Sequence, residues 1–101
     1  MAKQVIAEIT AVPLGTGSTS LSSYVKIAQR VIEQSGLEHT LTPMGTCVQG
    51  DLDTIFKTVS RIHEALAEAG CARISTHLKI DDRRDKDRVM QDKINAVLGK
   101  Q

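Results

Sequence analysis

The sequence predicts an α+β fold, a ferredoxin-like sandwich in which helices cover one face of a four-stranded antiparallel sheet. The expected elements follow the order β-α-β-β-α-β with one further helix, which makes two split β-α-β units around a central hairpin. The segment 51–69 has the clearest helical spacing of apolar residues in the chain. A length of 101 residues suits one domain, residues 1–101.

The first half of the chain is expected to supply a strand, a helix and a second strand. Residues 4–13 are rich in β-branched side chains, and alternation separates Val5, Ala7, Ile9 and Ala11 from Ile6, Glu8, Thr10 and Val12. The small-residue loop 14–20 (LGTGSTS) contains serines, of which Ser20 can cap a helix at about 21–35. The side of this helix that faces the core is expected to carry Leu21, Val25, Ala28 and Ile32, an inner stripe broadened by Tyr24 and Val31. Gly36 then ends the helix, and residues 37–42 form a short strand.

The segment 43–51 (PMGTCVQGD) combines a tight turn, a short strand and a helix start. Pro43 fixes φ and Gly45 tolerates a positive φ, so both suit a turn. Residues 46–49 can extend as a strand, which Gly50 and Asp51 end before capping the next helix. Small and hydroxyl side chains here allow a ligand to approach the backbone, so we expect any pocket at this turn.

The second half is expected to form a long helix, a strand and a final helix. The helix 51–69 carries its apolar residues at helical spacing: Leu52, Ile55, Phe56, Val59, Ile62 and Leu66. Residues 72–80 alternate as a strand, with Ile74, Thr76, Leu78 and Ile80 on one face. The charged run 81–88 leads into a helix that carries Val89 or Met90, Ile94, Val97 and Leu98.

Composition excludes several classes of protein. The net charge is +1, with 13 basic and 12 acidic residues, which argues against nucleic-acid or membrane-surface binding. Tyr24 and Phe56 are the only aromatic residues and neither lies in an expected strand, so the base-stacking platform of RNA-recognition modules is missing. No stretch approaches the ~20 apolar residues of a membrane span. Cys47 and Cys71 are too few for a disulfide scaffold, and we expect reduced thiols in a cytoplasmic protein.

The uncovered face of the sheet is expected to be aliphatic. A monomer seldom leaves such a face in water. We therefore expect a homo-oligomer, a dimer or a tetramer, in which sheets pack face to face.

Other candidate sites are weaker on the sequence alone. The loop 14–20 could cradle a phosphate, but it has no lysine, and a capped connector is the simpler interpretation. Glu8 and Thr10 lie within an aliphatic strand, where they either pair across an oligomer interface or form a pocket wall. His39, His63 and His77 lack metal-ligand spacing, with His63 expected in solvent and His39 near His77 on adjacent strands. The acidic residues of the run 81–88 alternate with arginine and lysine, which predicts a solvated or inter-subunit ion-pair network. A Cys47 nucleophile would need His39 as its base.

Three motifs together resemble a known family. They are Ile9–Gly15 (ITAVPLG), the segment from Pro43-Met44-Gly45-Thr46 to Gly50, and Lys79–Lys86 (KIDDRRDK). The chain resembles the small thiamine-binding protein family related to YkoF over almost its whole length. This resemblance implies a ferredoxin-like fold, dimers or tetramers, no catalysis, and binding of thiamine or its hydroxymethylpyrimidine part.

By position, the resemblance implies that Met44, Gly45 and Thr46 form the pocket floor and that Thr10 faces it. Glu8 would favour a cationic ligand, Tyr24 is the one aromatic residue available for stacking, and Gln49 stands where relatives carry an acidic residue. Aliphatic walls with one or two hydroxyls and a methionine suit a flat pyrimidine ring.

We therefore expect a cytoplasmic, non-catalytic binding protein for buffering, delivery or salvage of thiamine or its pyrimidine precursor, with no cofactor and no metal. The alternative is a structural or regulatory homo-oligomeric module without a small-molecule ligand. A hydrolase that uses Cys47 and His39 is a third interpretation.

Overall fold

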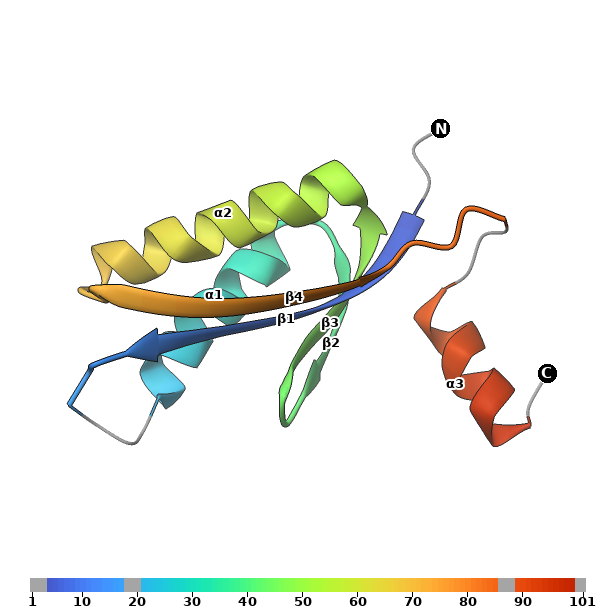
Figure 1. Cartoon of the computed structure of the whole chain (residues 1–101), viewed down its shortest axis with the longest axis horizontal. Coiled ribbons are helices and arrows are strands. Elements are labelled where there is room, and N and C mark those ends of the chain that lie inside the picture. Colours follow the sequence, from blue (N-terminus) through green and yellow to red (C-terminus); the bar gives the residue numbers. More distant parts are fainter. Residues whose placement is uncertain (1–3, 18–20, 86–88, 100–101) are drawn as a thin grey trace.

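The computed structural model describes residues 4–17, 21–85 and 89–99 and confirms the ferredoxin-like sandwich. Four antiparallel strands lie in the order β2-β3-β1-β4, and α1 and α2 cover one face of the sheet (Figure 1). The elements are β1 (Gln4–Leu14), α1 (Ser22–Gln34), β2 (Glu38–Thr42), β3 (Gly45–Asp51), α2 (Leu52–Glu68), β4 (Arg73–Asp81) and α3 (Met90–Leu98). The expected order of elements is therefore confirmed. Most element ends differ from their expected positions by one or two residues.

The central strand β1 fixes the faces of the sheet. Its residue Glu8 lies opposite Cys47 on β3 and opposite Lys79 on β4. Val5, Ala7 and Ile9 are buried, while the residues between them are only half-buried. The predicted alternation of β1 is thus confirmed, because burial on one side follows the two-residue period of a strand.

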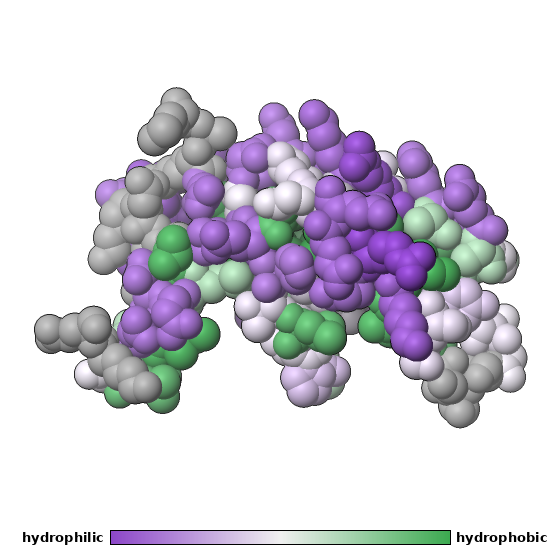
Figure 2. All heavy atoms as spheres, turned by 180° about the vertical axis from the view of Figure 1, so that it is seen from behind, coloured by the Kyte–Doolittle hydropathy of each residue, from purple (hydrophilic) through white to green (hydrophobic). Residues whose placement is uncertain are grey.

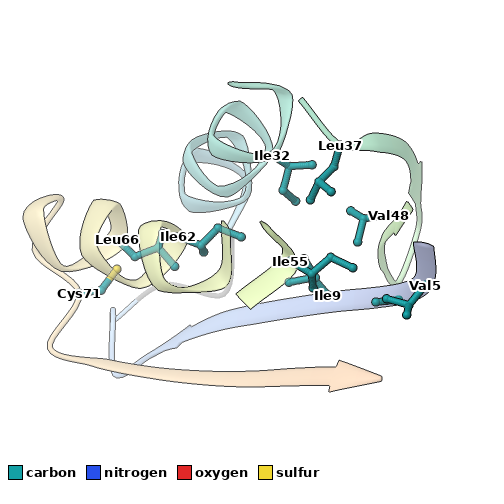
Figure 3. Close-up of a cluster of buried hydrophobic side chains, with 10 residues drawn as sticks. Val5, Ile9, Ile32, Leu37, Val48, Ile55, Ile62, Leu66 and Cys71 are labelled. Carbon is teal, nitrogen blue, oxygen red and sulfur yellow. The ribbon is translucent and has the colours of Figure 1, made fainter. Parts of the chain in front are cut away.

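The core lies between the sheet and the two covering helices. Figure 3 shows Ile32 of α1 beside Leu37 and Val48, and Ile62 and Leu66 of α2 pointing toward the strands. The predicted stripe of α2 is confirmed except at Phe56, which is half exposed. Thr58 is buried there, since its hydroxyl donates to the Thr54 carbonyl at 2.7 Å and leaves no unpaired donor.

Asp51 caps α2, as the sequence indicates. Its carboxylate accepts hydrogen bonds from the backbone N–H of Thr54 at 3.0 Å and from the Thr54 hydroxyl at 2.6 Å. These hydrogen bonds to Thr54 lower the pKa of Asp51. A carboxyl whose pKa is lower in the folded state stabilises the fold above its unfolded pKa. That stabilisation disappears as the pH falls through the folded value.

Two glycines play roles that the sequence did not indicate. Gly45 and Gly50 both lie within β3, so Gly50 does not end the strand as expected. Neither is among the glycines with positive φ. A Cβ at Gly45 would lie 2.6 Å from Thr10 Oγ1, and one at Gly50 would lie 2.2 Å from Leu37 Cδ2. Gly45 is the more restricted of the two, because the backbone oxygen of Ile9 also lies 3.0 Å from that position, whereas at Gly50 the end of the Leu37 side chain would have to shift.

The face of the sheet not covered by α1 and α2, the open face, differs from the expectation. The strand registers place mostly polar residues on it: Glu8, Thr10, Glu38, Thr40, Thr42, Gln49, Ser75, His77, Lys79 and Asp81. Ile6, Val12 and Leu14 of β1 are its aliphatic members; the first two are half-buried and Leu14 is exposed. The prediction of an aliphatic open face was therefore wrong, because polar residues of β3 and β4 alternate onto the same side as Glu8.

The last helix, α3, does not join α1 and α2. Figure 1 shows it apart from them, beyond one end of the sheet. Its N-terminus is attached to the open face, where the backbone N–H of Met90 donates to Gln49 Oε1 at 2.9 Å. The Gln49 amide in turn donates to Gln4 Oε1 at 2.9 Å. This pairing accounts for Gln49 being buried although its side chain is polar.

The charged run after β4 forms local ion pairs, as expected. Arg83 pairs with Asp85 and Arg84 with Asp82, each at 2.8 Å, and Asp85 raises the pKa of Arg83. Lys86, Asp87, Arg88 and the proposed cap Ser20 lie outside the described residues. In the described ranges, no helix combines the length and apolarity that crossing a bilayer requires.

Candidate functional site

A cleft of about 210 Å³ lies between α1, β1 and the β2–β3 hairpin, at the position where the sequence placed a pocket. We call it the hairpin cleft. Its walls are Ile9, Thr10, Ala11, Val12, Pro13, Leu21, Val25, Ala28, Gln29, Ile32, Leu41, Thr42, Pro43, Met44, Gly45, Thr46 and Ile62. These lining residues are mainly aliphatic and include no charged side chain. Such walls with a few polar groups are typical of sites for small, uncharged ring systems.

The main side-chain polar pair of the hairpin cleft is formed by Thr46 and Gln29. Thr46 faces the helices from β3, is only 5% exposed, and donates from its hydroxyl to Gln29 Oε1 on α1 at 3.1 Å. The amide hydrogens on Nε2 of Gln29 have no hydrogen-bond partner among the described residues. The pair therefore offers donors at Nε2 and an acceptor at the threonine oxygen.

The turn beside the hairpin cleft is held by two threonine hydroxyls. Pro43 and Met44 form the two-residue connection between β2 and β3. Thr10 Oγ1 donates to the Met44 carbonyl at 3.1 Å, and Thr42 Oγ1 donates to the Gly45 carbonyl at 2.9 Å. The Met44 side chain is 79% exposed at the mouth of the cleft. A ligand could thus gain a soft apolar contact there without displacing packed residues.

The structure brings four of the six expected ligand-binding residues together. Thr10, Met44, Gly45 and Thr46 all line the hairpin cleft. Sequence reasoning missed Gln29, although a signal was present. Gln29 lies four residues after Val25, so helical spacing places this polar side chain on the same face as the inner stripe.

Glu8 and Tyr24 lie elsewhere. Tyr24 is half-buried against the core and does not line the hairpin cleft. Glu8 lines a second cavity, of about 460 Å³, on the open face together with Cys47, Lys79 and Lys93. The alternation of β1 separates Glu8 from the helix-facing Thr46. Neither residue therefore enters the site proposed below.

The thiol of Cys47 has a raised pKa. Burial is the larger cause, and the negative charge of Glu8 across the strand pair adds to it. Both effects oppose formation of the thiolate, which is the nucleophilic form.

We expect alkylation of Cys47 by iodoacetamide to rise with pH at a midpoint above that of an ordinary cysteine. Glu8→Gln should lower this midpoint, because it removes a negative charge from beside the sulfur. Peptide mass spectrometry distinguishes Cys47 from the buried Cys71. A midpoint at or below the ordinary value would contradict the assigned environment.

The pair needed for a Cys47 nucleophile is not formed. Thr40, rather than His39, lies opposite Cys47, and His39 contacts the Leu37 carbonyl through Nδ1 at 3.1 Å. His39 and His77 lie on β2 and β4, the two edges of the sheet, so their expected proximity was wrong.

His63 was also placed incorrectly from sequence. Its Nε2 lies 2.6 Å from the hydroxyl of Thr76 on β4, so it joins α2 to the sheet. In the described ranges, no three His, Cys, Asp or Glu side chains are grouped so that they could hold a metal ion.

Comparison with known proteins adds a family assignment to this geometry. A family model described as "Thiamine-binding protein" matches residues 7–98. A UPF0045 protein of Methanothermobacter thermautotrophicus is 45% identical over 97 residues, which cover 95% of this chain and 98% of the relative. The UPF0045 protein YqgV of Bacillus subtilis is 38% identical, with 91% and 92% of the two chains covered.

Solved structures share the fold. The hypothetical protein MJ1052 of Methanocaldococcus jannaschii has a TM-score of 0.87 at 37% identity, and the match covers 94% of this chain and 96% of that one. A candidate thiamine biosynthesis/salvage protein of Thermotoga maritima, TM0486, has a TM-score of 0.82 at 21% identity, covering 93% and 98%. At 21% identity, the similarity to TM0486 shows a shared fold and nothing further.

Proposed function

Because this chain belongs to the thiamine-binding protein family, we propose that it binds thiamine or its hydroxymethylpyrimidine part, without catalysis, in the hairpin cleft. The observation that carries this proposal is the Thr46–Gln29 pair in an otherwise aliphatic cleft. The family membership supports a thiamine-related role, and the cleft supplies a chemically suitable place for it.

The polar pair complements the edge of an aminopyrimidine. A ring nitrogen of such a ligand accepts a hydrogen bond, and its exocyclic amine donates one. Gln29 Nε2 can donate to the ring nitrogen, while Thr46 Oγ1 can accept from the amine. The aliphatic walls then contact the two faces of the ring, which gains apolar burial without leaving a polar edge unpaired.

Size and charge favour the pyrimidine part as the portion held inside. The cleft volume of about 210 Å³ lies below the ~300–1,000 Å³ typical of sites for drug-sized ligands, so it suits a single ring. The lining residues provide no carboxylate for the cationic thiazolium. We infer that the thiazolium stays at the mouth, beside Met44, where water remains in contact with its charge.

The cellular role follows from the same proposal. A binding protein of this kind would buffer, deliver or salvage the vitamin or its precursor, and we place it in the cytoplasm as a homo-oligomer. A second candidate function is an assembly module without a small ligand. The exposed apolar side chains of α3 favour that candidate, and ligand titration separates the two functions.

Calorimetric titration tests the binding proposal. We expect saturable binding of hydroxymethylpyrimidine with one site per chain, and thiamine should bind with similar affinity because its thiazolium adds few contacts. Thiamine phosphate should bind no more tightly than thiamine, since no charged residue lines the cleft to receive the phosphate. Absence of saturable binding for all three compounds would favour the assembly module instead.

A further inference from the structure

Met44 is the most exposed sulfur-containing residue in the described part of the chain. It is 79% exposed, whereas Cys71 is 8% exposed and Cys47 and Met90 are half-buried. Figure 2 shows hydrophobic side chains on the projecting end of the β2–β3 hairpin, at the lower centre of that view. An oxidant in solution therefore reaches the Met44 thioether without any opening of the fold.

The backbone of Met44 is held at both of its polar groups. Its carbonyl accepts a hydrogen bond from the Thr10 hydroxyl at 3.1 Å, and its N–H donates to the Thr42 hydroxyl at 3.3 Å. The next residue, Gly45, packs so closely against β1 that a Cβ there would lie 3.0 Å from the Ile9 carbonyl oxygen. This turn keeps the Met44 side chain at the mouth of the hairpin cleft, so a chemical change in the thioether alters the cleft itself.

Oxidation converts this soft apolar group into a polar one. The sulfur lone pair attacks one oxygen of a hydroperoxide, the O–O bond breaks, an S–O bond forms, and water or an alcohol leaves. The thioether loses two electrons and the peroxide gains them. A ligand entering the cleft would then have to remove water from the sulfoxide oxygen. The side chains of Val25 and Leu41, which also line the cleft, offer that oxygen no donor in exchange.

We propose that Met44 is a reversible oxidation site that controls the hairpin cleft, in which the sulfoxide weakens the binding of a pyrimidine ring. This inference rests on the proposed function, because it concerns ligand binding at the same site. Methionine sulfoxide is returned to the thioether by methionine sulfoxide reductases. The exposure of Met44 makes its sulfoxide accessible to such an enzyme.

The two thiols of the chain compete poorly for the same oxidant. Peroxides react with the thiolate, and burial together with the charge of Glu8 raises the pKa of Cys47 and so disfavours that form. Cys71 is buried. A thioether has no proton to lose, so its oxidation does not require deprotonation. Treatment at about pH 6, below the ordinary pKa of a thiol, therefore favours Met44 over both cysteines.

Peptide mass spectrometry and calorimetric titration after hydrogen peroxide treatment at about pH 6 test the proposal. We expect Met44 to be oxidised several times faster than the half-buried Met90. The oxidised chain should bind hydroxymethylpyrimidine roughly five- to tenfold more weakly than the untreated chain. Incubation with the two methionine sulfoxide reductases, one for each sulfoxide epimer, should restore the affinity.

Two variants identify the responsible sulfur. Met90→Leu changes a methionine that does not line the hairpin cleft, so peroxide should weaken its binding as it does for the unaltered chain. Met44→Leu has no thioether at the mouth, so its treated and untreated samples should bind equally, whatever its own affinity. A loss of affinity in treated Met44→Leu would assign the effect to another residue and overturn the proposal.

The untreated chain separates this inference from the proposed function. If the untreated chain does not bind hydroxymethylpyrimidine, the proposed function fails and control of binding by Met44 fails with it. If it binds, and complete conversion of Met44 to the sulfoxide leaves the affinity unchanged, the proposed function holds and this inference is overturned. Equal rates of oxidation at Met44 and Met90 would overturn the assignment of Met44 as the preferred site.

Discussion

Replacing Gln29 with leucine is expected to weaken hydroxymethylpyrimidine binding roughly ten- to hundredfold. Leucine occupies a similar volume but removes the Nε2 donors of a residue that lines the hairpin cleft. The bound ring nitrogen and the Thr46 hydroxyl would both lose a partner, and a buried polar group left without one costs about 1–3 kcal/mol. Calorimetric titration measures this loss directly.

Two further variants make that result specific. Thr46→Val keeps the shape of the side chain, removes the hydroxyl and should weaken binding to a similar extent. Gln34→Leu makes the same change as Gln29→Leu at an exposed position on the same helix, and it should leave the affinity unchanged. Equal affinities for Gln29→Leu, Thr46→Val and the unaltered chain would show that the ligand does not contact this pair.

Ile62→Ala is expected to lower the free energy of unfolding by about 2–5 kcal/mol and also to weaken binding. Ile62 is fully buried in the core, and shortening such a side chain removes apolar contacts and leaves a cavity. Ile62 also forms part of the wall of the hairpin cleft. Chemical denaturation measures the change in stability, and titration at low temperature measures the affinity of the folded fraction.

Ile55→Ala is the matched control for this variant. Ile55 is equally buried on the same helix but does not line the cleft. It should lose a comparable amount of stability while its folded fraction binds with unaltered affinity. If Ile55→Ala weakened binding as much as Ile62→Ala, the effect would report general loosening of the core rather than contact with the ligand.

The fold could be predicted largely from local patterns. The period-two alternation of β1 and the helical stripe of α2 each identify their element and its buried side. The predicted roles of Gly45 and Gly50 were wrong, because the sequence does not distinguish a glycine required by a turn from a glycine that lies beneath another side chain. Only the three-dimensional structure reveals that the side chains of Leu37 and Thr10 lie over them.

The candidate site was predictable in part for a similar reason. Met44, Gly45 and Thr46 are neighbours in sequence, so a single turn places them together. Gln29 comes from another element, and its contact with Thr46 depends on how α1 packs on the sheet. Glu8 was assigned to the same pocket although strand alternation turns it to the open face. The position of α3 was not predictable, because its attachment depends on the Gln49 amide from a distant strand.

The central claim is that a pyrimidine ring occupies the hairpin cleft between α1 and the β2–β3 turn. Amide NMR spectra recorded during addition of hydroxymethylpyrimidine test it most directly. We predict saturable shifts concentrated at residues 28–29 and 44–46, with little change at Lys79 or Lys93 on the open face. Shifts centred on Glu8, Cys47 and Lys79 instead, or none at saturating ligand, would contradict it.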